Sequence, residues 1–284
     1  MEIIKMHGLG NDFVCLDRFF STSDLDYPKL ARSLCDRHFG IGADGLVVIL
    51  PSTKADAKMR IFNSDGSEPE MCGNGIRCFA KYVYDVGYVA KEEMTVETLA
   101  GILTVKLIVD KGEAQMITVN MGHPRLKPEE IPVKVAGRQA VREKLQVNGH
   151  TLVFTAVSMG NPHCVIFCSD FADLDFAAFG PAVEKHPLFP QKTNVEFVRV
   201  DSPTELTVKV WERGVGPTLA CGTGACASVV AAVLEGKCER KATVHLPGGD
   251  LYIEWGQDDQ IFMTGPAVYV FQATLLNEKP KRRI

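Results

Sequence analysis

The chain has 284 residues, of which 46% are hydrophobic and 23% are charged, and its formal net charge at pH 7 is −4. This composition is ordinary for a soluble globular protein, and the length allows one large domain or two of about 140 residues each. The charge balance gives no reason to expect nucleic acid or an anionic membrane as a partner, and the basic run from Lys279 to Arg283 is typical of a solvated chain end.

Segments rich in β-branched residues predict strands throughout the chain. In chain order they are residues 45–50, 105–109, 116–120, 152–157, 164–168, 194–200, 206–211 and 251–255. Two helices are predicted directly after glycine-rich segments. The first carries an apolar face that runs from Ile76 through Phe79, Ala80 and Val83 to Tyr84. The second, over residues 225–234, is apolar all round, and we therefore expect it to be buried.

The two halves of the chain repeat each other weakly. Residues 72–78 are echoed by residues 221–226 at an offset of 149, and residues 10–11 by residues 160–161 at an offset of 150. Residues 60–63 and 95–101 recur at offsets of 149 and 148. Four blocks in the same order with a nearly constant, long offset indicate a duplicated domain.

The predicted fold class is therefore α+β with two pseudo-symmetric halves. Each half is expected to be a mainly antiparallel curled sheet or barrel around a buried central helix, with the active site in the cleft between the halves. We place the N-terminal half at residues 1–121 and the C-terminal half at residues 122–267. The C-terminal segment 268–284 is expected to return to the first half.

Cys72 and Cys221 directly precede the glycines that open the two predicted helices. A thiol at a helix start lies beside unsatisfied backbone N–H groups and the positive end of the helix dipole, which lower its pKa. The glycines at 73, 75, 222 and 224 would allow a carboxylate to approach these N–H groups. One cysteine could then remove the α-proton of an amino acid while the other returns a proton on the opposite face. The N–H donors would stabilise the developing charge without a pyridoxal cofactor.

The chain contains nine cysteines and no recognisable secretory signal. This combination favours buried or reactive thiols over a disulfide framework, and it predicts a reducing, cytoplasmic location. The cysteines in or near apolar runs are interpreted as buried packing residues. The duplicated glycine-rich context distinguishes Cys72 and Cys221 from them. No metal site is predicted, because the spacings 72–78 and 221–226 are wider than those of paired zinc ligands.

The sequence resembles the diaminopimelate epimerase family nearly from end to end. The resemblance rests on residues 5–13, 63–67, 72–78, 158–163, 212–214 and 220–226. It implies interconversion of LL- and meso-2,6-diaminopimelate, in lysine and peptidoglycan-precursor biosynthesis, without pyridoxal phosphate or metal. It also implies a homodimer, with the small-molecule substrate as the ligand and no nucleic acid or membrane partner.

The resemblance further implies which residues form the site. Cys72 and Cys221 would be the catalytic pair, with His163 and Glu212 near the thiols. The residues expected to contact the substrate are Asn11, Asn63, Gly73, Asn74, Asn161, Asn194, Glu212, Arg213, Gly222 and Thr223. Backbone N–H groups at 73, 74, 222 and 223 would hold the reacting carboxylate, and the remaining residues would read the distal end. A guanidinium can grip a carboxylate with two parallel hydrogen bonds, and a glutamate can pair with an ammonium.

Two positions depart from some family members. Gly45 stands where certain relatives have glutamine, so it is not included among the binding residues. Thr223 stands where others have serine, a difference expected to matter little if the backbone N–H binds the substrate. Three alternative functions remain open: a proline or hydroxyproline racemase of the same fold, a redox protein with a reversible disulfide between the two cysteines, and a structural zinc protein.

Overall fold

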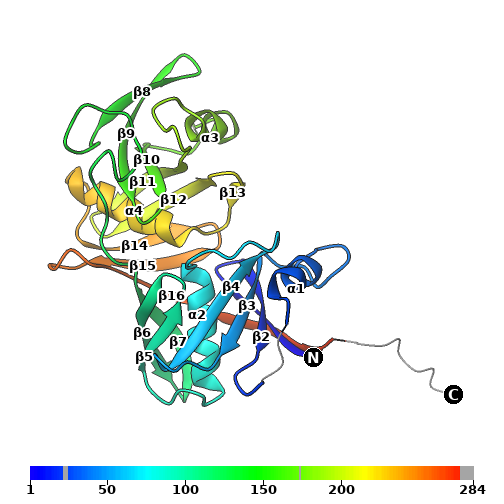
Figure 1. Ribbon diagram of the computed structural model, residues 1–284. Helices are drawn as coiled ribbons and strands as arrows, with labels where there is room; N and C mark the ends of the chain where they lie inside the picture. The colour runs from blue at the N-terminus through cyan, green and yellow to red at the C-terminus, as the bar shows by residue number, and fades with distance from the viewer. Residues whose placement is uncertain (22–24, 173, 276–284) are drawn as a thin grey trace. The chain divides into compact units, whose positions relative to one another are not determined.

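The computed structural model describes residues 1–21, 25–172 and 174–275 (Figure 1), so the basic run that begins at Lys279 lies outside the described residues. The chain forms two compact units. One comprises Met1–Val119 together with the segment from Gly265 onward, and the other comprises Asn120–Thr264. No helix of the described residues is long and apolar enough to cross a membrane.

The first unit is a curled sheet with two helices. Its elements are β1 (Glu2–Gly8), β2 (Asn11–Asp17), α1 (Tyr27–Leu34), β3 (Gly45–Leu50), β4 (Ala57–Asn63), α2 (Gly73–Asp85), β5 (Glu93–Thr98), β6 (Gly101–Asp110), β7 (Glu113–Asn120) and β17 (Val268–Thr274). Strands β1 to β7 pair in chain order, and β17 pairs antiparallel with β1. Helix α2 packs on the inner face of this sheet, against β1, β2, β3, β4 and β6 (Figure 1).

The second unit has the same kind of architecture. Its elements are β8 (Glu143–Val147), β9 (His150–Ser158), β10 (Pro162–Phe167), α3 (Phe176–Glu184), β11 (Asn194–Ser202), β12 (Glu205–Glu212), β13 (Gly216–Thr218), α4 (Gly222–Leu234), β14 (Lys241–Leu246), β15 (Gly249–Trp255) and β16 (Ile261–Pro266). The strands pair in chain order, except that the short β13 flanks β12 and β12 also pairs with β14.

The order of parallel and antiparallel strand pairs shows that the two units have the same topology. From β1 to β7 the successive pairs are antiparallel, parallel, antiparallel, parallel, antiparallel and antiparallel. The pairs from β9 through β12 to β14, β15 and β16 follow the same order. Parallel neighbours need a crossover connection, and a helix supplies it each time: α1 and α2 in one unit, α3 and α4 in the other. The predicted pseudo-symmetric α+β fold is confirmed.

The second central helix is buried as predicted. In α4, ten of the thirteen residues are buried, and Val229 and Val230 are fully enclosed. The helix packs against strands β9, β10, β11, β12, β14 and β15. Many of its side chains are small, so the surrounding strands can approach the helix closely.

Helix α2 is buried more completely than its one-sided apolar pattern indicates. Arg77 is fully enclosed and Lys81 is 6% exposed, although both are cations. The Arg77 guanidinium donates to the carbonyls of Pro266 (3.1 Å) and Gly73 (3.2 Å). The Lys81 ammonium donates to the Ala114 carbonyl at 2.6 Å and pairs with a carboxylate one helical turn away. Buried charges are tolerated where they are paired in this way.

Candidate functional site

In the first unit, the candidate site is built around the start of α2. Cys72 is the N-cap residue, and its sulfur accepts a hydrogen bond from the Gly75 N–H at 3.5 Å. The same sulfur lies 3.9 Å from Oδ1 of Asn11, which also accepts a hydrogen bond from the Asn74 side chain at 3.0 Å. The structure therefore brings together three of the predicted residues, Asn11, Cys72 and Asn74, at one helix start.

Asp44, which the sequence reasoning missed, holds Asn11 in place. Its carboxylate accepts a hydrogen bond from the Asn11 amide at 2.7 Å and another from Arg37 at 2.9 Å. Asn63 lies close by in the fold, because Ser64 donates its N–H to the Asp44 carbonyl. The exposed Asn63 side chain donates to a serine hydroxyl four residues later. An acidic residue flanked by small residues, directly before a buried strand, is the signal that could have identified Asp44.

The neighbouring Asp12 makes the stability of this region depend on pH. Burial raises the pKa of Asp12, but hydrogen bonds from Lys5 and Arg37 outweigh it and lower the pKa to about 2. Because the folded pKa lies below the unfolded value of 3.8, ionised Asp12 stabilises the fold above about pH 4, and this contribution is lost as the pH falls toward 2. We expect about 1–2 kcal/mol after allowance for solvent screening. In urea unfolding, the stability difference between the wild type and Asp12→Asn should shrink over this range; a constant difference would contradict the assignment.

In the second unit, the equivalent helix start carries Cys221. Cys221 is the N-cap residue of α4, and its sulfur accepts a hydrogen bond from the Gly224 N–H at 3.4 Å. The sulfur also lies 3.5 Å from the Thr223 hydroxyl oxygen. Unlike Cys72, which is half-buried, Cys221 is only 7% exposed.

A chain of hydrogen bonds leads from this thiol into the interior. The Asn161 amide donates to the Thr223 hydroxyl at 3.2 Å, and Oδ1 of Asn161 lies 3.0 Å from Nε2 of His163. On the other side of the imidazole, Nδ1 lies 2.7 Å from Oε1 of Glu196. His163 and Glu196 are both fully buried. The sequence reasoning included Asn161, His163 and Thr223 but missed Glu196, although a lone acidic residue in an apolar strand is a recognisable signal.

Three of the residues expected to read the distal end of the substrate, Asn194, Glu212 and Arg213, lie in the second unit at the start of β11 and the end of β12. Asn194 is buried; its amide donates to the Pro162 carbonyl and its Oδ1 accepts the Arg213 N–H, both at 2.9 Å. The exposed Arg213 side chain donates to a backbone carbonyl at 3.3 Å. Glu212 accepts a hydrogen bond from the Thr218 hydroxyl at 2.7 Å. Asn194 thus fixes the backbone from which Arg213 extends.

The expectation of a lowered thiol pKa at the helix start is wrong for Cys221. The pKa of Cys221 is raised well above its ordinary value, first by burial and then by the charges of Glu212 and Glu196, and the hydrogen bonds from Thr223 and Gly224 do not compensate. The helix start alone therefore does not make this thiol acidic.

The glycines at 75, 222 and 224 allow close packing within each unit. A Cβ atom at residue 75 would lie 2.7 Å from the Ile61 side chain, and one at residue 222 would lie 2.9 Å from the Met263 sulfur. At residue 224 it would lie 2.7 Å from Oε1 of Glu196. Each helix start is therefore pressed against its own sheet.

The Thr223 hydroxyl should contribute to activity, in contrast to the expectation that only its backbone N–H matters. Thr223→Val keeps the shape of the side chain but removes the hydroxyl that joins Asn161 to Cys221. We expect kcat/KM to fall about tenfold, the equivalent of one hydrogen bond. Thr223→Ser is the matched control and should keep nearly full activity. Equal kcat/KM for the valine and serine variants would contradict a role of the hydroxyl.

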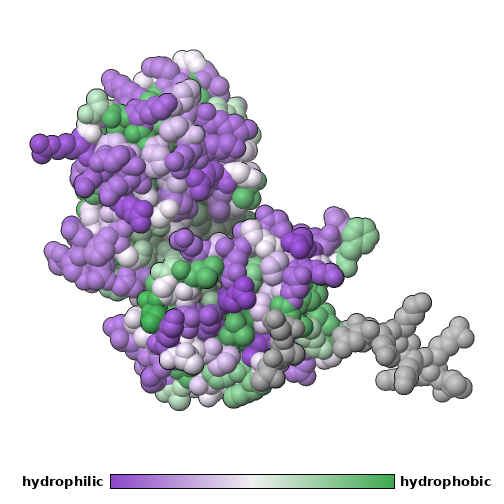
Figure 2. Space-filling view, in the orientation of Figure 1, coloured by the Kyte–Doolittle hydropathy of each residue, from purple (hydrophilic) through white to green (hydrophobic). Residues whose placement is uncertain are grey.

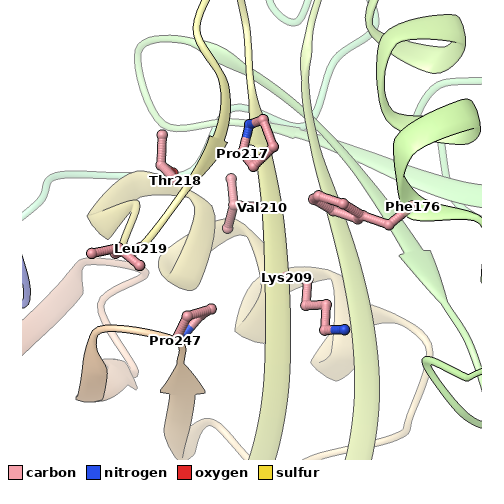
Figure 3. A pocket seen from close by; sticks show the side chains of 7 residues that line it. All are labelled: Phe176, Lys209, Val210, Pro217, Thr218, Leu219 and Pro247. Atoms are coloured by element: carbon pink, nitrogen blue, oxygen red, sulfur yellow. The ribbon is translucent and has the colours of Figure 1, made fainter.

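A pocket of about 240 Å³ lies in the second unit beside β12 and β13 (Figure 3). Its lining residues are Phe176, Lys209, Val210, Pro217, Thr218, Leu219 and Pro247. Figure 3 shows Phe176 extending from α3 toward Val210 of β12. None of the predicted site residues lines this pocket, so it is separate from the cluster around Cys221.

All nine cysteines, each within the described residues, are free thiols. In the part of the chain that the structure describes, no group of three or more histidine, cysteine, aspartate or glutamate side chains is placed to hold a metal ion.

Comparison with known sequences gives the family. The sequence profile of diaminopimelate epimerases matches residues 3–127 and 155–270. The chain belongs to the diaminopimelate epimerase family. It is 65% identical to the diaminopimelate epimerase of Desulfitobacterium hafniense, over 98% of this chain and 99% of that protein. It is 55% identical to that of Moorella thermoacetica, over 96% and 98% of the two chains. The protein is therefore an isomerase.

Solved structures share the fold at low sequence identity. A phenazine biosynthesis protein of the PhzF family from Bacillus anthracis has a TM-score of 0.70 at 17% identity and covers 97% of this chain and 99% of its own. A hydroxyproline epimerase from Agrobacterium vitis, with bound trans-4-hydroxy-L-proline, has a TM-score of 0.69 at 13% identity and covers 96% and 91% of the two chains. The diaminopimelate epimerase family thus shares its fold with other epimerases.

Proposed function

We propose that the protein interconverts LL- and meso-2,6-diaminopimelate by moving one α-proton between two cysteines. Cys72 and Cys221 are the catalytic acid and base, and no cofactor takes part. The observation that carries the proposal is the repeated geometry: each cysteine is the N-cap of the central helix in one copy of a duplicated fold. Membership of the diaminopimelate epimerase family supports the choice of substrate.

The chemistry requires a base on one face of the α-carbon and an acid on the other. In the direction that starts from a Cys72 thiolate, Cys72 removes the proton and the Cys221 thiol donates one to the opposite face. The substrate carboxylate gains negative charge as the proton leaves, and N–H groups at the helix starts stabilise this charge. After one turnover the two thiols have exchanged protonation states, and the reverse reaction uses them in the opposite roles.

The distal amino acid group of the substrate distinguishes diaminopimelate from proline. We assign its recognition to Asn11, Asn63, Asn161, Asn194, Glu212 and Arg213. The guanidinium of Arg213 suits a carboxylate, and the Glu212 carboxylate suits an ammonium. A proline racemase has no use for such groups, because proline carries no second charged head.

The experiment is α-proton exchange in D₂O, followed by NMR, with the reduced protein and LL-diaminopimelate. We expect deuterium to enter the α-position as the meso isomer appears. Exchange with proline, and none with diaminopimelate, would move the assignment to the racemases of the same fold. No exchange with either amino acid would leave a redox role for the two thiols.

We also propose that the protein is a cytoplasmic homodimer that acts in lysine and peptidoglycan-precursor biosynthesis. The surface of β17 supports the dimer, because Val268, Tyr269, Val270 and Phe271 are each between 39% and 54% exposed. Figure 2 shows hydrophobic surface in this region, near the N-terminus. Exposed apolar patches commonly mark interfaces. Sedimentation velocity should show a dimer that Val270→Lys dissociates, and a monomeric wild type would refute the proposal.

A further inference from the structure

The carboxylate of Glu196 is an unusual feature of the second unit. It is fully buried in β11, and only one of its two oxygens is satisfied. Oε1 lies 2.7 Å from Nδ1 of His163, whereas the buried Oε2 makes no hydrogen bond to any described residue. A buried carboxylate that is half-satisfied is costly, and such groups cluster at functional sites.

Glu196 lies directly beside the start of α4. A Cβ atom built at residue 224 would be 2.7 Å from Oε1 of Glu196 and 3.3 Å from the sulfur of Cys221. The carboxylate and the thiol therefore flank the same point of the helix start. They are also joined by the hydrogen-bonded chain through His163, Asn161 and Thr223 described above.

The first unit has no such group in the matching place. In the duplicated fold, β3 of the first unit corresponds to β11 of the second. The matching registers of the β2–β3 and β10–β11 pairs place Val47 at the position of Glu196. At the start of α2, a Cβ atom at residue 75 would meet the side chains of Ile61 and Val47 (2.7 and 3.6 Å). Likewise, Phe13 occupies the position of His163. One helix start thus rests on apolar side chains and the other on a buried acid.

The largest influences on Cys221 disfavour its thiolate. Burial raises the pKa of Cys221, and the negative charges of Glu212 from β12 and Glu196 from β11 raise it further. Nδ1 of His163 from β10 lies 2.7 Å from Oε1 of Glu196. Glu196 also raises the pKa of Cys164 on the same strand, after the larger effect of burial. Only the Thr223 hydroxyl and the Gly224 N–H favour the thiolate of Cys221.

We propose that Glu196 is a positioning residue that keeps the resting proton of the cysteine pair on Cys221, so that Cys72 begins as the base. This inference rests on the proposed two-cysteine mechanism and adds to it the assignment of the resting protons. The mechanism requires one thiolate and one thiol before substrate arrives, and a symmetrical pair would divide the proton equally. Glu196 breaks that symmetry, and its hydrogen bond to His163 also orients the chain that reaches Thr223.

The test compares Glu196→Gln with Glu235→Gln. Glutamine keeps the size of the side chain and an oxygen for His163 but removes the charge. Catalysis requires the resting thiol to stay protonated, so kcat/KM falls at alkaline pH as that proton is lost. The position of this alkaline limb of the pH profile therefore reports the titration of the thiol. We expect the limb to move down by about one pH unit in Glu196→Gln. Glu235, a buried carboxylate at the other end of α4, is the matched control, and its variant should keep the wild-type limb.

A second measurement follows the resting thiolate directly, by its ultraviolet absorbance in the unliganded protein. At mildly alkaline pH this absorbance should disappear in Cys72→Ala and persist in Cys221→Ala, and it should rise in Glu196→Gln. Loss of the signal in Cys221→Ala instead would overturn the proposal, even if Glu196→Gln failed to fold. The proposal would also be overturned if Glu196→Gln kept both the alkaline limb of kcat/KM and the thiolate titration of the wild type.

Different results would refute the two-cysteine mechanism and the role of Glu196. Epimerase activity that survives in Cys72→Ala or Cys221→Ala would refute the two-cysteine mechanism itself. Activity lost in both variants, together with an unchanged thiolate titration in Glu196→Gln, would refute only the role of Glu196.

Discussion

Replacing either Cys72 or Cys221 by serine is expected to lower kcat by at least about a thousandfold, because each thiol supplies a proton transfer that a hydroxyl of much higher pKa cannot make. The substitution changes one atom and keeps the N-cap, since a serine oxygen accepts the hydrogen bond from the third helical residue at least as well as sulfur does. The fold should therefore survive, and a loss of activity would report the chemistry. The rate of interconversion followed by NMR, with circular dichroism to monitor folding, measures both effects.

Cys168→Ser is the matched control for these variants. Cys168 is a half-buried thiol of the second unit that bonds the Val198 carbonyl, and a serine can make the same bond. Its variant should retain wild-type kcat. If Cys72→Ser or Cys221→Ser kept more than about a tenth of wild-type kcat, the acid–base role of that residue would be excluded.

Arg213→Ala should raise KM for diaminopimelate by about ten- to a hundredfold, because a charge-assisted pair with the distal carboxylate is worth roughly 1.5–3 kcal/mol. The substitution leaves the local backbone intact, since Asn194 holds the Arg213 N–H and not its side chain. Among the described residues the exposed guanidinium makes one long hydrogen bond, to the Gln191 carbonyl, so stability should change little. Steady-state kinetics in both reaction directions measure the effect.

Arg213→Lys separates charge from geometry. Lysine keeps the positive charge but cannot form two parallel hydrogen bonds, so its KM should lie between those of the wild type and the alanine variant. Unchanged KM and kcat in Arg213→Ala would show that this residue does not recognise the distal end of the substrate.

Much of the fold was predictable from the sequence, because the signals were local or repeated. The strand over residues 45–50 coincides with β3, and the apolar segment after Cys221 forms the buried helix α4. The constant offset between halves indicated the duplication that the strand pairing shows. Helices α1 and α3 were not predicted, because each is only two turns long and the signal that starts it is a single aspartate cap, Asp26 or Asp175.

The environment of the thiols was less predictable, because it depends on residues distant in sequence. Glu196 meets the start of α4 only after β10 and β11 have paired in parallel, and no local pattern gives that distance. The same holds for Asp44, which reaches Asn11 through the pairing of β2 with β3. Burial and such contacts raise the pKa of Cys221 and outweigh the effect of the helix start.

The pairing of β1 with β17 has a consequence for how the protein is made. Glu2 and Thr274 are register partners although almost the whole chain separates them. During synthesis the ribosome releases β1 first and β17 last, so the outer edge of β1 has no partner until translation is nearly complete. The second unit is contiguous in sequence and can fold while the first still lacks its final strand. Closure of this long loop should therefore be a late, slow step of folding, and a nascent chain stalled before residue 268 should present a strand edge to chaperones.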